Sequence, residues 1–307
     1  MLSLPCANQI VVPASLMKPA PFKYVAAVSL EQALALKAEY GDEARFLAGG
    51  QSLVPALNFR LAQPSVLIDI NPLAQLSGIA WKNGAALRIG ALTRYRTLER
   101  DPFIADTLPL VREALPHIAH PQIRNRGTLG GNLAHADPAS ELPAIVLALG
   151  GRLHARSMAR ERWIEARDFF VAPLTTALQA DEMLLEIELP VRGAGSGFCF
   201  MEVARRRGDF ALAGIAIAIT LGTDGRCRSA RITLCGVGET PVDVSDAAAG
   251  LVGQPVHQAE IDHVAASVQK GIDPPGNLHA SKEFQRHLAG VLVKRALRSA
   301  LERAHHG

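Results

Sequence analysis

Two glycine-rich segments combine the residue types that bind phosphate. The first glycine segment, residues 47–53, reads Leu-Ala-Gly-Gly-Gln-Ser-Leu, and the second glycine segment, residues 124–133, reads Arg-Asn-Arg-Gly-Thr-Leu-Gly-Gly-Asn-Leu. Glycine lets backbone N–H groups approach an anion, and Ser, Thr and Asn side chains add short hydrogen-bond donors. Neither segment matches the G-x-G-x-x-G or the G-x-x-x-x-G-K-[ST] pattern. Together they predict a diphosphate held between two pieces of structure.

A third glycine pair, Gly150-Gly151, shows that pairing alone carries little weight. The chain has 26 glycines in 307 residues, and roughly two adjacent pairs are expected by chance at such a content. Gly150-Gly151 is interpreted as a turn, the ordinary role of such a pair. The functional interpretation therefore depends on the hydroxyl and amide side chains that accompany the glycines of the other two segments.

The composition is typical of a soluble globular protein with two or three lobes. Hydrophobic residues make up 49% and charged residues 20% of the 307 residues, enough to build large cores. The 32 basic and 29 acidic residues give a net charge of +3, which is too balanced to predict nucleic-acid binding. No apolar run is long enough to predict a membrane span.

The cysteines and histidines predict no metal site. The four cysteines lack C-x-x-C spacing, which predicts neither a disulfide framework nor an iron–sulfur or zinc cluster, and favours a reducing, cytoplasmic setting. His117 and His120 lie between two prolines with no acidic or cysteine neighbour in the sequence, so we interpret them as structural. The cysteines are Cys6, Cys199, Cys227 and Cys235.

The N-terminal residues do not resemble a targeting signal. Residues 1–16 are mildly apolar and have no basic region before the apolar stretch, so no signal peptide is predicted. A natural beginning is expected at Met17. We therefore predict that residues 1–16 are a non-native or disordered extension.

The pattern around the first glycine segment predicts a strand–loop–helix–strand unit. Ser29 and Gln32 form a capping-box pattern for a helix that ends at Gly41. A buried strand over 44–48 leads into the segment, a helix over 52–61 follows it, and a second strand covers 66–70. This arrangement places the N–H groups of residues 49–53 at a helix N-terminus, where an anion is favoured.

The remaining elements alternate between helix and strand, with one clear linker at residues 194–197. Thr93 is expected to cap the helix that follows the strand at 86–90. The tail from residue 293 carries a helical apolar stripe. Further predicted helices cover 108–115 and a stretch ending at 149, and further strands cover 152–156, 184–189, 198–203 (with a slip before Val203), 215–221 and 230–235.

Three motifs together resemble a known family. They are Ala-Gly-Gly-Gln-Ser-Leu at 48–53, Arg-Asn-x-Gly-Thr-x-Gly-Gly-Asn-Leu at 124–133, and Ala-Asp-Pro-Ala-Ser-Glu-Leu-Pro at 136–143. Arg-Arg-Gly-Asp-Phe-Ala at 206–211 and the stretch 279–288 extend the match toward the C-terminus. The chain resembles, over roughly residues 17–305, the FAD-binding medium subunit of molybdenum hydroxylases, the group that includes carbon monoxide dehydrogenase and xanthine dehydrogenase.

The resemblance implies an α+β protein with a two-lobed, PCMH-type FAD-binding fold and a small α+β C-terminal domain. The FAD-binding domain is expected at 17–192, with lobes at about 17–70 and 71–192. The C-terminal domain is expected at 196–307.

The resemblance also implies the residues that contact FAD. The first glycine segment wraps the pyrophosphate, and the second binds the diphosphate and the flavin side. Glu141 binds the adenosine-side ribose or its neighbourhood, Leu184 packs against the cofactor, and Phe210 covers a flavin face. Without the family context, Phe210 is equally well interpreted as a core aromatic. The residues assigned to FAD are Ala48, Gly49, Gly50, Gln51, Ser52, Leu53, Ala119 (by a backbone contact), Thr128, Gly130, Gly131, Asn132, Glu141, Leu184 and Phe210.

The sequence departs from the family pattern at two positions. Glu141 stands where Asp is more common, which lengthens that side chain by one methylene. Met201 stands where xanthine dehydrogenases tend to carry Lys, which weakens any inference to their NAD-reducing variant. The inserted cysteine cluster of the relatives that reduce benzoyl-coenzyme A thioesters is missing from the sequence.

The chain lacks the residue patterns of a self-contained hydrolase. Residues 50–54 are not a G-x-S-x-G elbow, because position 54 is Val, and no catalytic residue is predicted. The resemblance implies an electron-transfer subunit in a heterotrimer, commonly doubled to a dimer of heterotrimers. In that complex a large subunit binds molybdopterin and a small subunit carries [2Fe–2S] clusters. The FAD of this chain collects electrons from those clusters and passes them to an external acceptor.

Two alternatives stay open at this point. The chain is a self-sufficient FAD-dependent oxidoreductase of the same fold, or it is a flavin-binding scaffold that lost its electron partners. The organic substrate and the electron acceptor, whether NAD, quinone, oxygen or a carrier protein, are not encoded in these motifs.

Overall fold

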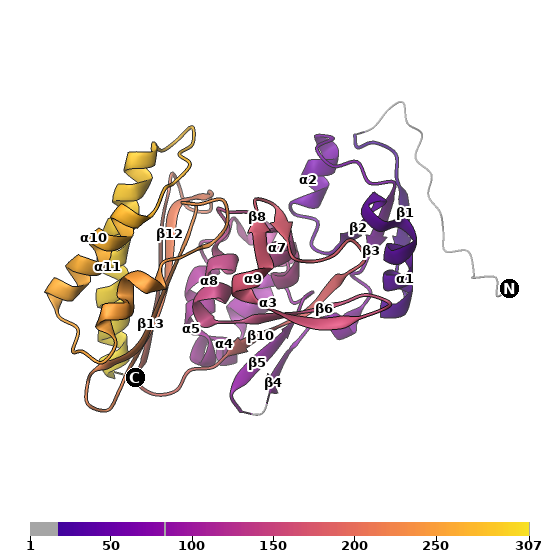
Figure 1. Ribbon diagram of the computed structural model, residues 1–307. Coiled ribbons are helices and arrows are strands. Elements are labelled where there is room, and N and C mark those ends of the chain that lie inside the picture. The colour runs from indigo at the N-terminus through magenta and orange to yellow at the C-terminus, as the bar shows by residue number, and fades with distance from the viewer. Residues whose placement is uncertain (1–17, 83, 307) are drawn as a thin grey trace.

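The computed structural model describes residues 18–82 and 84–306, and the chain forms three units that lie side by side (Figure 1). The prediction for residues 1–16 lies outside the described residues. We call the units the first lobe (residues 18–76), the second lobe (77–192) and the C-terminal unit (196–306). The second lobe lies between the other two. Each unit contains one larger sheet, of three, five and four strands respectively.

The first lobe is a parallel sheet with strand order β1-β3-β2. Ser29 begins helix α1 by accepting a hydrogen bond from the backbone N–H of Gln32 at 3.1 Å, and Gly41, with φ of +50°, ends it. The strand–loop–helix–strand prediction is confirmed, although helix α2 is shorter than expected. The elements are β1 (Lys23–Ala26), α1 (Leu30–Tyr40), η1 (Gly41–Glu43), β2 (Ala44–Leu47), α2 (Leu53–Asn58), β3 (Val66–Asp69) and η2 (Ala74–Leu76).

The second lobe is an antiparallel sheet with strand order β4-β5-β10-β6-β7. The long strand β10 lies at its centre and pairs with strands that are distant in the sequence. A two-stranded hairpin, β8-β9, follows helix α9. The strands are β4 (Ile79–Lys82), β5 (Ala86–Gly90), β6 (Arg152–Arg156), β7 (Glu161–Glu165), β8 (Phe170–Ala172), β9 (Thr175–Thr176) and β10 (Met183–Pro190).

The helices of the second lobe correct two sequence predictions. The cap of helix α3 is Arg94, not Thr93; the Thr93 hydroxyl instead exchanges hydrogen bonds with the backbone of Gly78. The second glycine segment is not the open loop expected around a diphosphate, because it forms the second half of helix α6 and most of helix α7. The helices are α3 (Tyr95–Arg100), α4 (Pro102–Thr107), α5 (Pro109–Ala114), α6 (Pro121–Arg126), α7 (Leu129–His135), α8 (Glu141–Leu149) and α9 (Ala166–Phe169).

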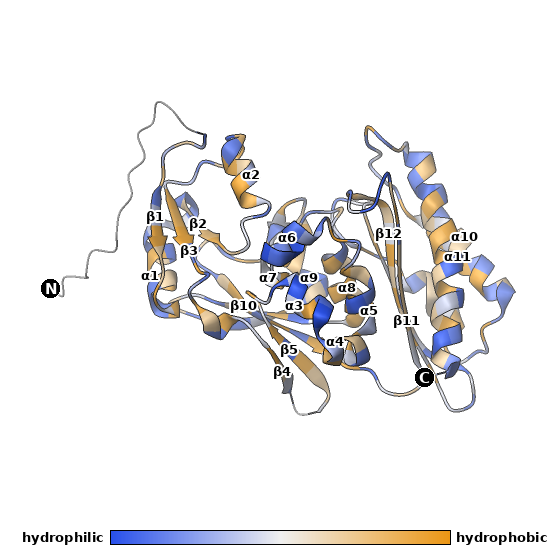
Figure 2. Ribbon diagram, turned by 180° about the vertical axis from the view of Figure 1, so that it is seen from behind, coloured by the Kyte–Doolittle hydropathy of each residue, from blue (hydrophilic) through white to orange (hydrophobic). Residues whose placement is uncertain are grey.

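The C-terminal unit is a four-stranded antiparallel sheet with helices α10 and α11 on one face and helices α5 and α8 of the second lobe on the other (Figure 1). Strand β12 is therefore buried on both faces, which explains its nearly unbroken apolar sequence (Figure 2). The slip predicted before Val203 is misplaced: the pairing of β11 with β12 stays in register through Val203, and the register shift lies between Val203 and Ala204. The elements are β11 (Ser196–Ala204), β12 (Ala211–Leu221), β13 (Cys227–Cys235), β14 (Val242–Asp243), η3 (Ser245–Leu251), α10 (Gln258–Gly271) and α11 (Lys282–His306).

Each of the three units contains one large apolar core, and some of these cores include residues of a neighbouring unit. The core of the first lobe continues past the predicted lobe boundary at about residue 70, because it includes Leu76 and Leu92. Strand β10 contributes alternate residues to two cores: Met183 packs in the core of the first lobe and Leu184 in that of the second. Within residues 18–82 and 84–306, no helix is both long and apolar enough to cross a bilayer.

Candidate cofactor site

The first glycine segment leaves a row of backbone donors free. It connects strand β2 to helix α2, at the C-terminal edge of the parallel sheet. None of the backbone N–H groups of residues 48–53 donates a hydrogen bond to an acceptor in the described part of the chain. Unpaired amides at a helix start carry partial positive charge and bind anions. The segment thus has the chemistry that the sequence predicted for a diphosphate.

Two glycines give this segment its shape for different reasons. Gly50 has φ of +73°, a conformation that L-residues adopt at a cost. At Gly49 a Cβ atom would lie 2.5 Å from the carbonyl oxygen of Arg126. The segment therefore lies directly against the chain that enters the second glycine segment.

The second glycine segment has a different hydrogen-bond pattern. Leu129 and Gly130 donate their N–H groups to the carbonyls of Thr93 and Ala91, at 3.0 and 2.8 Å. Gly131 donates to the hydroxyl of Thr128 at 3.1 Å, because Thr128 is the N-cap of helix α7. Since these amides already have partners, they do not provide the backbone clasp that the sequence predicted for this segment.

The side chains of the second glycine segment are also engaged. Thr128 is 1% exposed, and Asn132 exchanges hydrogen bonds with the Ser140 hydroxyl at 2.6 and 3.0 Å. The backbone N–H of Asn132 donates to the Thr128 carbonyl at 3.1 Å. The segment is thus a rigid support that lies next to the first: a Cβ atom at Gly131 would lie 3.7 Å from the Cβ of Ala48.

Ala119, one of the residues predicted to contact the cofactor, has a strained backbone. Ala119 has φ of +45°, and its carbonyl accepts a hydrogen bond from Arg124 at 3.1 Å. A Cβ atom at Gly208 would lie 2.6 Å from the same carbonyl, so the loop of the C-terminal unit that precedes Phe210 lies against Ala119. Positive φ at non-glycine residues is costly and is concentrated at functional sites. Among the described residues the non-glycine positions with positive φ are Arg60, Ala119, Ala136 and Leu174.

Phe210 lies at the surface, which excludes its interpretation as a core aromatic. Its side chain is 67% exposed and lines a cavity of about 560 Å³ together with Asp137 and Pro138, which follow helix α7. Pro138 is joined to the C-terminal unit by a hydrogen bond from the N–H of Gly236 at 2.8 Å. An exposed aromatic ring at a cavity has the chemistry that a cover for a planar cofactor requires.

Glu141 is buried where the second lobe meets the C-terminal unit. Only 6% of it is exposed, and burial, together with the nearby carboxyl of Glu202, raises the pKa of Glu141 to about 8. At neutral pH this side chain is therefore largely protonated. A ribose hydroxyl at this position would meet a neutral carboxyl group rather than a carboxylate.

The same junction contains a pair that sequence reasoning missed. The Nδ1 atom of His117 lies 3.2 Å from Oε1 of Glu202, so the statement that His117 has no acidic neighbour holds for the sequence but not for the fold. Oε2 of Glu202 is buried and has no hydrogen-bond partner among the described residues. Strand pairing places Glu202 opposite Gly214 and Gly214 opposite Cys235. No pattern along the chain predicts these neighbours, because strand register creates them.

Leu184 contributes to the core of the second lobe. It is 6% exposed and lies on strand β10 opposite Ala155. Its predicted contact with a cofactor is therefore limited to the small part of the side chain that is not covered.

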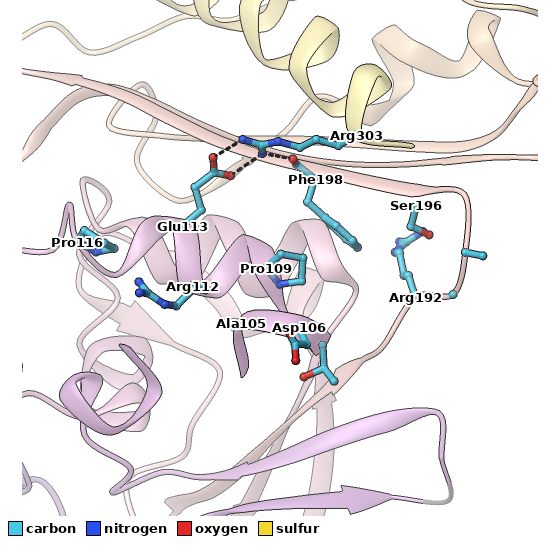
Figure 3. A pocket seen from close by; sticks show the side chains of 13 residues that line it. Ala105, Asp106, Pro109, Arg112, Glu113, Pro116, Arg192, Ser196, Phe198 and Arg303 are labelled. Atoms are coloured by element: carbon cyan, nitrogen blue, oxygen red, sulfur yellow. Dashed lines mark hydrogen bonds and ion pairs between the residues drawn. The ribbon is translucent and has the colours of Figure 1, made fainter. Parts of the chain in front are cut away.

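A larger cavity, of about 640 Å³, lies on another side of the junction (Figure 3). It is lined by the ion pair of Glu113 with Arg303, 2.9 Å apart, and by Arg112 and Arg192 at opposite ends. None of the residues predicted to contact the cofactor lines it, so we place the candidate site at the glycine segments.

Comparison with known proteins gives the same family for both parts of the chain. Residues 20–192 match the model of the FAD binding domain in molybdopterin dehydrogenase. Residues 198–300 match the model of the CO dehydrogenase flavoprotein C-terminal domain.

Individual relatives match over nearly their whole length. The 6-hydroxypseudooxynicotine dehydrogenase complex subunit alpha of Paenarthrobacter nicotinovorans is 42% identical, with 94% of this chain and 97% of the relative covered. The caffeine dehydrogenase subunit beta of Pseudomonas sp. (strain CBB1) is 40% identical, with 94% and 98% covered. A solved structure of carbon monoxide dehydrogenase from Hydrogenophaga pseudoflava superposes with a TM-score of 0.90 at 36% identity and covers 94% of this chain and 99% of that one.

The cofactor implied by these matches fits the residues present. FAD carries a diphosphate, which suits the free amides of the first glycine segment, and a planar ring, which suits the exposed Phe210. The chain belongs to the family of FAD-binding medium subunits of molybdenum hydroxylases, which are subunits of oxidoreductase complexes.

Proposed function

We propose that this chain is the electron-transfer subunit of a molybdenum hydroxylase complex. It takes electrons from [2Fe–2S] clusters of a partner subunit and passes them to an external acceptor. The observation that carries the proposal is the row of free amides in residues 48–53, which lies next to a rigid second segment. Bound FAD supplies the redox chemistry, and the protein supplies binding and orientation.

We propose the following roles for the residues of the site. The first glycine segment, Ala48 to Leu53, donates its amides to the diphosphate. Thr128, Gly130, Gly131 and Asn132 support it from helix α7, and Phe210 covers one face of the flavin. The remaining contacts are assigned to the backbone of Ala119 and to the side chains of Glu141 and Leu184.

We propose that the partners are a large molybdopterin-binding subunit and a small [2Fe–2S] subunit, in a heterotrimer that doubles to a dimer of heterotrimers. The relatives support this assembly, because their names are those of a complex subunit alpha, a subunit beta and medium chains. A reducing, cytoplasmic setting is supported by the buried free thiols of Cys199, Cys227 and Cys235. The domain boundaries proposed are 17–192 and 196–307.

The test is purification of the tagged chain, once from its native host and once alone. From the host we expect two further subunits, with molybdenum and iron in the preparation and oxidation of an organic substrate. Alone, the chain is expected to bind FAD, detected by visible absorbance after gel filtration, and to oxidise no organic substrate. Turnover by the chain alone would support a self-sufficient oxidoreductase instead. FAD binding without partners would support a scaffold, and a colourless protein in FAD titrations would refute the proposal.

A further inference from the structure

A hydrogen-bond network centred on Arg94 is connected to the first glycine segment at Ala48. One guanidinium nitrogen of Arg94 donates to Oδ1 of Asn71 at 2.5 Å, and the other terminal nitrogen donates to the carbonyl of Arg126. The side-chain amide of Asn71 donates to the carbonyl of Ala48 at 2.8 Å. Asp69 fixes Asn71 by accepting from its backbone N–H at 2.9 Å. Arg94 thus links the first glycine segment to the segment before helix α7.

This link joins the first lobe to the second lobe. Asn71 belongs to the first lobe, and Arg94 and Arg126 belong to the second. The carbonyl of Arg126 that accepts from Arg94 is the same oxygen that leaves no room for a Cβ atom at Gly49. One planar guanidinium therefore sets the spacing between the free amides and the second glycine segment.

The positive charge of Arg94 has no close carboxylate partner. Within the described ranges, no carboxylate lies within 4.0 Å of the guanidinium of Arg94 or Arg126. Burial, and then the neighbouring Arg126, lower the pKa of Arg94, and the more distant carboxylate of Asp69 acts in the opposite direction. Two arginines without a carboxylate partner, beside a row of unpaired amides, form a region that is complementary to a dianion.

We propose that Arg94 is a positioning residue for the diphosphate of FAD, through its fork-shaped bonds to Asn71 and to the carbonyl of Arg126. This inference rests on the proposed function, because it needs FAD to be the ligand. The fork holds the first glycine segment so that its amides converge on one anion. A lysine at this position would keep the positive charge but would not donate to both acceptors at once. The planar guanidinium has two separate terminal nitrogens, whereas the ammonium group has one.

The experiment measures FAD affinity of the full chain by quenching of flavin fluorescence. Arg94→Lys, Arg94→Gln and Asn71→Ala are each expected to raise the Kd for FAD by about 10- to 100-fold, the usual effect of losing a hydrogen bond to a charged group. Titration with ADP, which carries a diphosphate but no flavin, is expected to show the same loss. Arg96→Lys is the matched control, because Arg96 lies two residues further on and pairs with Glu99 at 3.1 Å. The control is expected to change the Kd by less than about 2-fold.

A melting curve recorded with and without FAD separates positioning from general stability. For a positioning role, the FAD-free chain melts as the Arg96→Lys control does, and the rise in melting temperature that FAD causes is reduced. Wild-type affinity in Arg94→Lys would overturn the proposal, since charge alone would then suffice. A lower melting temperature of the FAD-free variants with an unchanged FAD-induced rise would also overturn it. If the wild-type chain itself binds no FAD, the proposed function fails instead.

Discussion

The two glycine segments have similar residues but opposite hydrogen-bond states. In residues 48–53 no backbone N–H group has an acceptor among the described residues, whereas in residues 129–132 every N–H group donates to a carbonyl or hydroxyl of the chain. The first segment leaves a strand and enters a short helix, and its amides meet no acceptor there. The second begins a helix that has its own threonine cap and lies against residues 91–93. This difference supports the proposal that the first segment binds the diphosphate and the second supports it.

The difference shows that a glycine-rich motif does not by itself define an anion site. A glycine is also needed wherever another chain approaches closely. At Gly130 a Cβ atom would lie 2.4 Å from the Cβ of Ala91, so this glycine permits packing. In the first segment Gly50 is needed for its positive φ. Mutations in the two segments should therefore have different primary effects, binding in one and stability in the other.

The largest effect is expected from Gly50→Val. A β-branched residue at φ of +73° forces the first segment to change shape, so its amides no longer converge. We expect FAD affinity to fall by more than about 100-fold, equivalent to about 3 kcal/mol. Flavin absorbance after gel filtration measures retention.

Gly225→Val is the matched control for that substitution. Gly225 has φ of +74° in a turn, and a Cβ atom there would meet nothing within 4 Å. The control carries the same backbone strain but should keep FAD. Equal loss of FAD in both variants would mean that Gly50 acts through stability, and the contrast between the segments would be lost.

Glu141, at the start of helix α8, is expected to make the stability of the chain depend on pH. Its pKa is 4.5 in an unfolded chain and about 8 in the folded protein, so the folded state holds a proton that the unfolded state releases between these values. The contribution of Glu141 to the free energy of unfolding should therefore be largest below pH 4.5, decrease as the pH rises to about 8, and then level off, by a few kcal/mol (about 1.4 per pKa unit).

Urea unfolding of the FAD-free chain at several pH values tests this dependence. In Glu141→Gln the decrease should be much smaller, because the amide does not ionise. A wild-type decrease that persists unchanged in Glu141→Gln would assign the dependence to other groups of the protein.

Gly130→Ala is expected to affect stability before binding. The added methyl group would collide with Ala91, and overpacking of this kind costs about 1–3 kcal/mol. Urea unfolding of the FAD-free chain should show this loss, while FAD affinity falls far less than in Gly50→Val. In the control Gly271→Ala, at the end of helix α10, the methyl group meets nothing within 4 Å. A large loss of FAD affinity with an unchanged free energy of unfolding would place Gly130 among the binding residues.

The smallest effect is expected from the cap of helix α7. Thr128→Val removes the hydroxyl that accepts from Gly131 and should lower the free energy of unfolding by about 1 kcal/mol. Thr128→Ser keeps the hydroxyl and should remain close to wild type. If Thr128→Ser instead loses FAD while keeping stability, the methyl group of Thr128 has a role in binding that the structure does not show.

Much of the fold was predictable because local patterns agree with it. The strand before the first glycine segment, the helix after it and the second strand were predicted from apolar runs and caps, and the structure confirms them. The slip in strand β11 was predicted before Val203 from the alternation of apolar residues, but the register shift lies after Val203, because pairing with β12 decides its place. Thr93 shows the limit: a capping residue in the right place bonds instead to Gly78, which lies 15 residues earlier.

The residue types of the candidate site were predictable from the sequence, but the residues that hold the two glycine segments together were not. Arg94 and Asn71 were missed because they belong to different lobes and lie 23 residues apart in the sequence, although they are hydrogen-bonded to each other. The pairing of His117 with Glu202 was missed because it joins the second lobe to a strand of the C-terminal unit. The only hint for Asn71 was its place just after a strand of a parallel sheet, where binding residues often lie.

The amino-acid sequence by itself determined the residue types from which a diphosphate site at residues 48–53 is predicted, and the apolar patterns and caps of most helices and strands, because these properties depend on neighbouring residues. The tertiary structure decided which of the two glycine segments keeps its amides free and that Glu141 holds a proton at neutral pH. The physical reason is that hydrogen-bond acceptors and burial come from distant parts of the chain: Ala91 and Thr93 occupy the donors of one segment, and the C-terminal sheet removes water from Glu141.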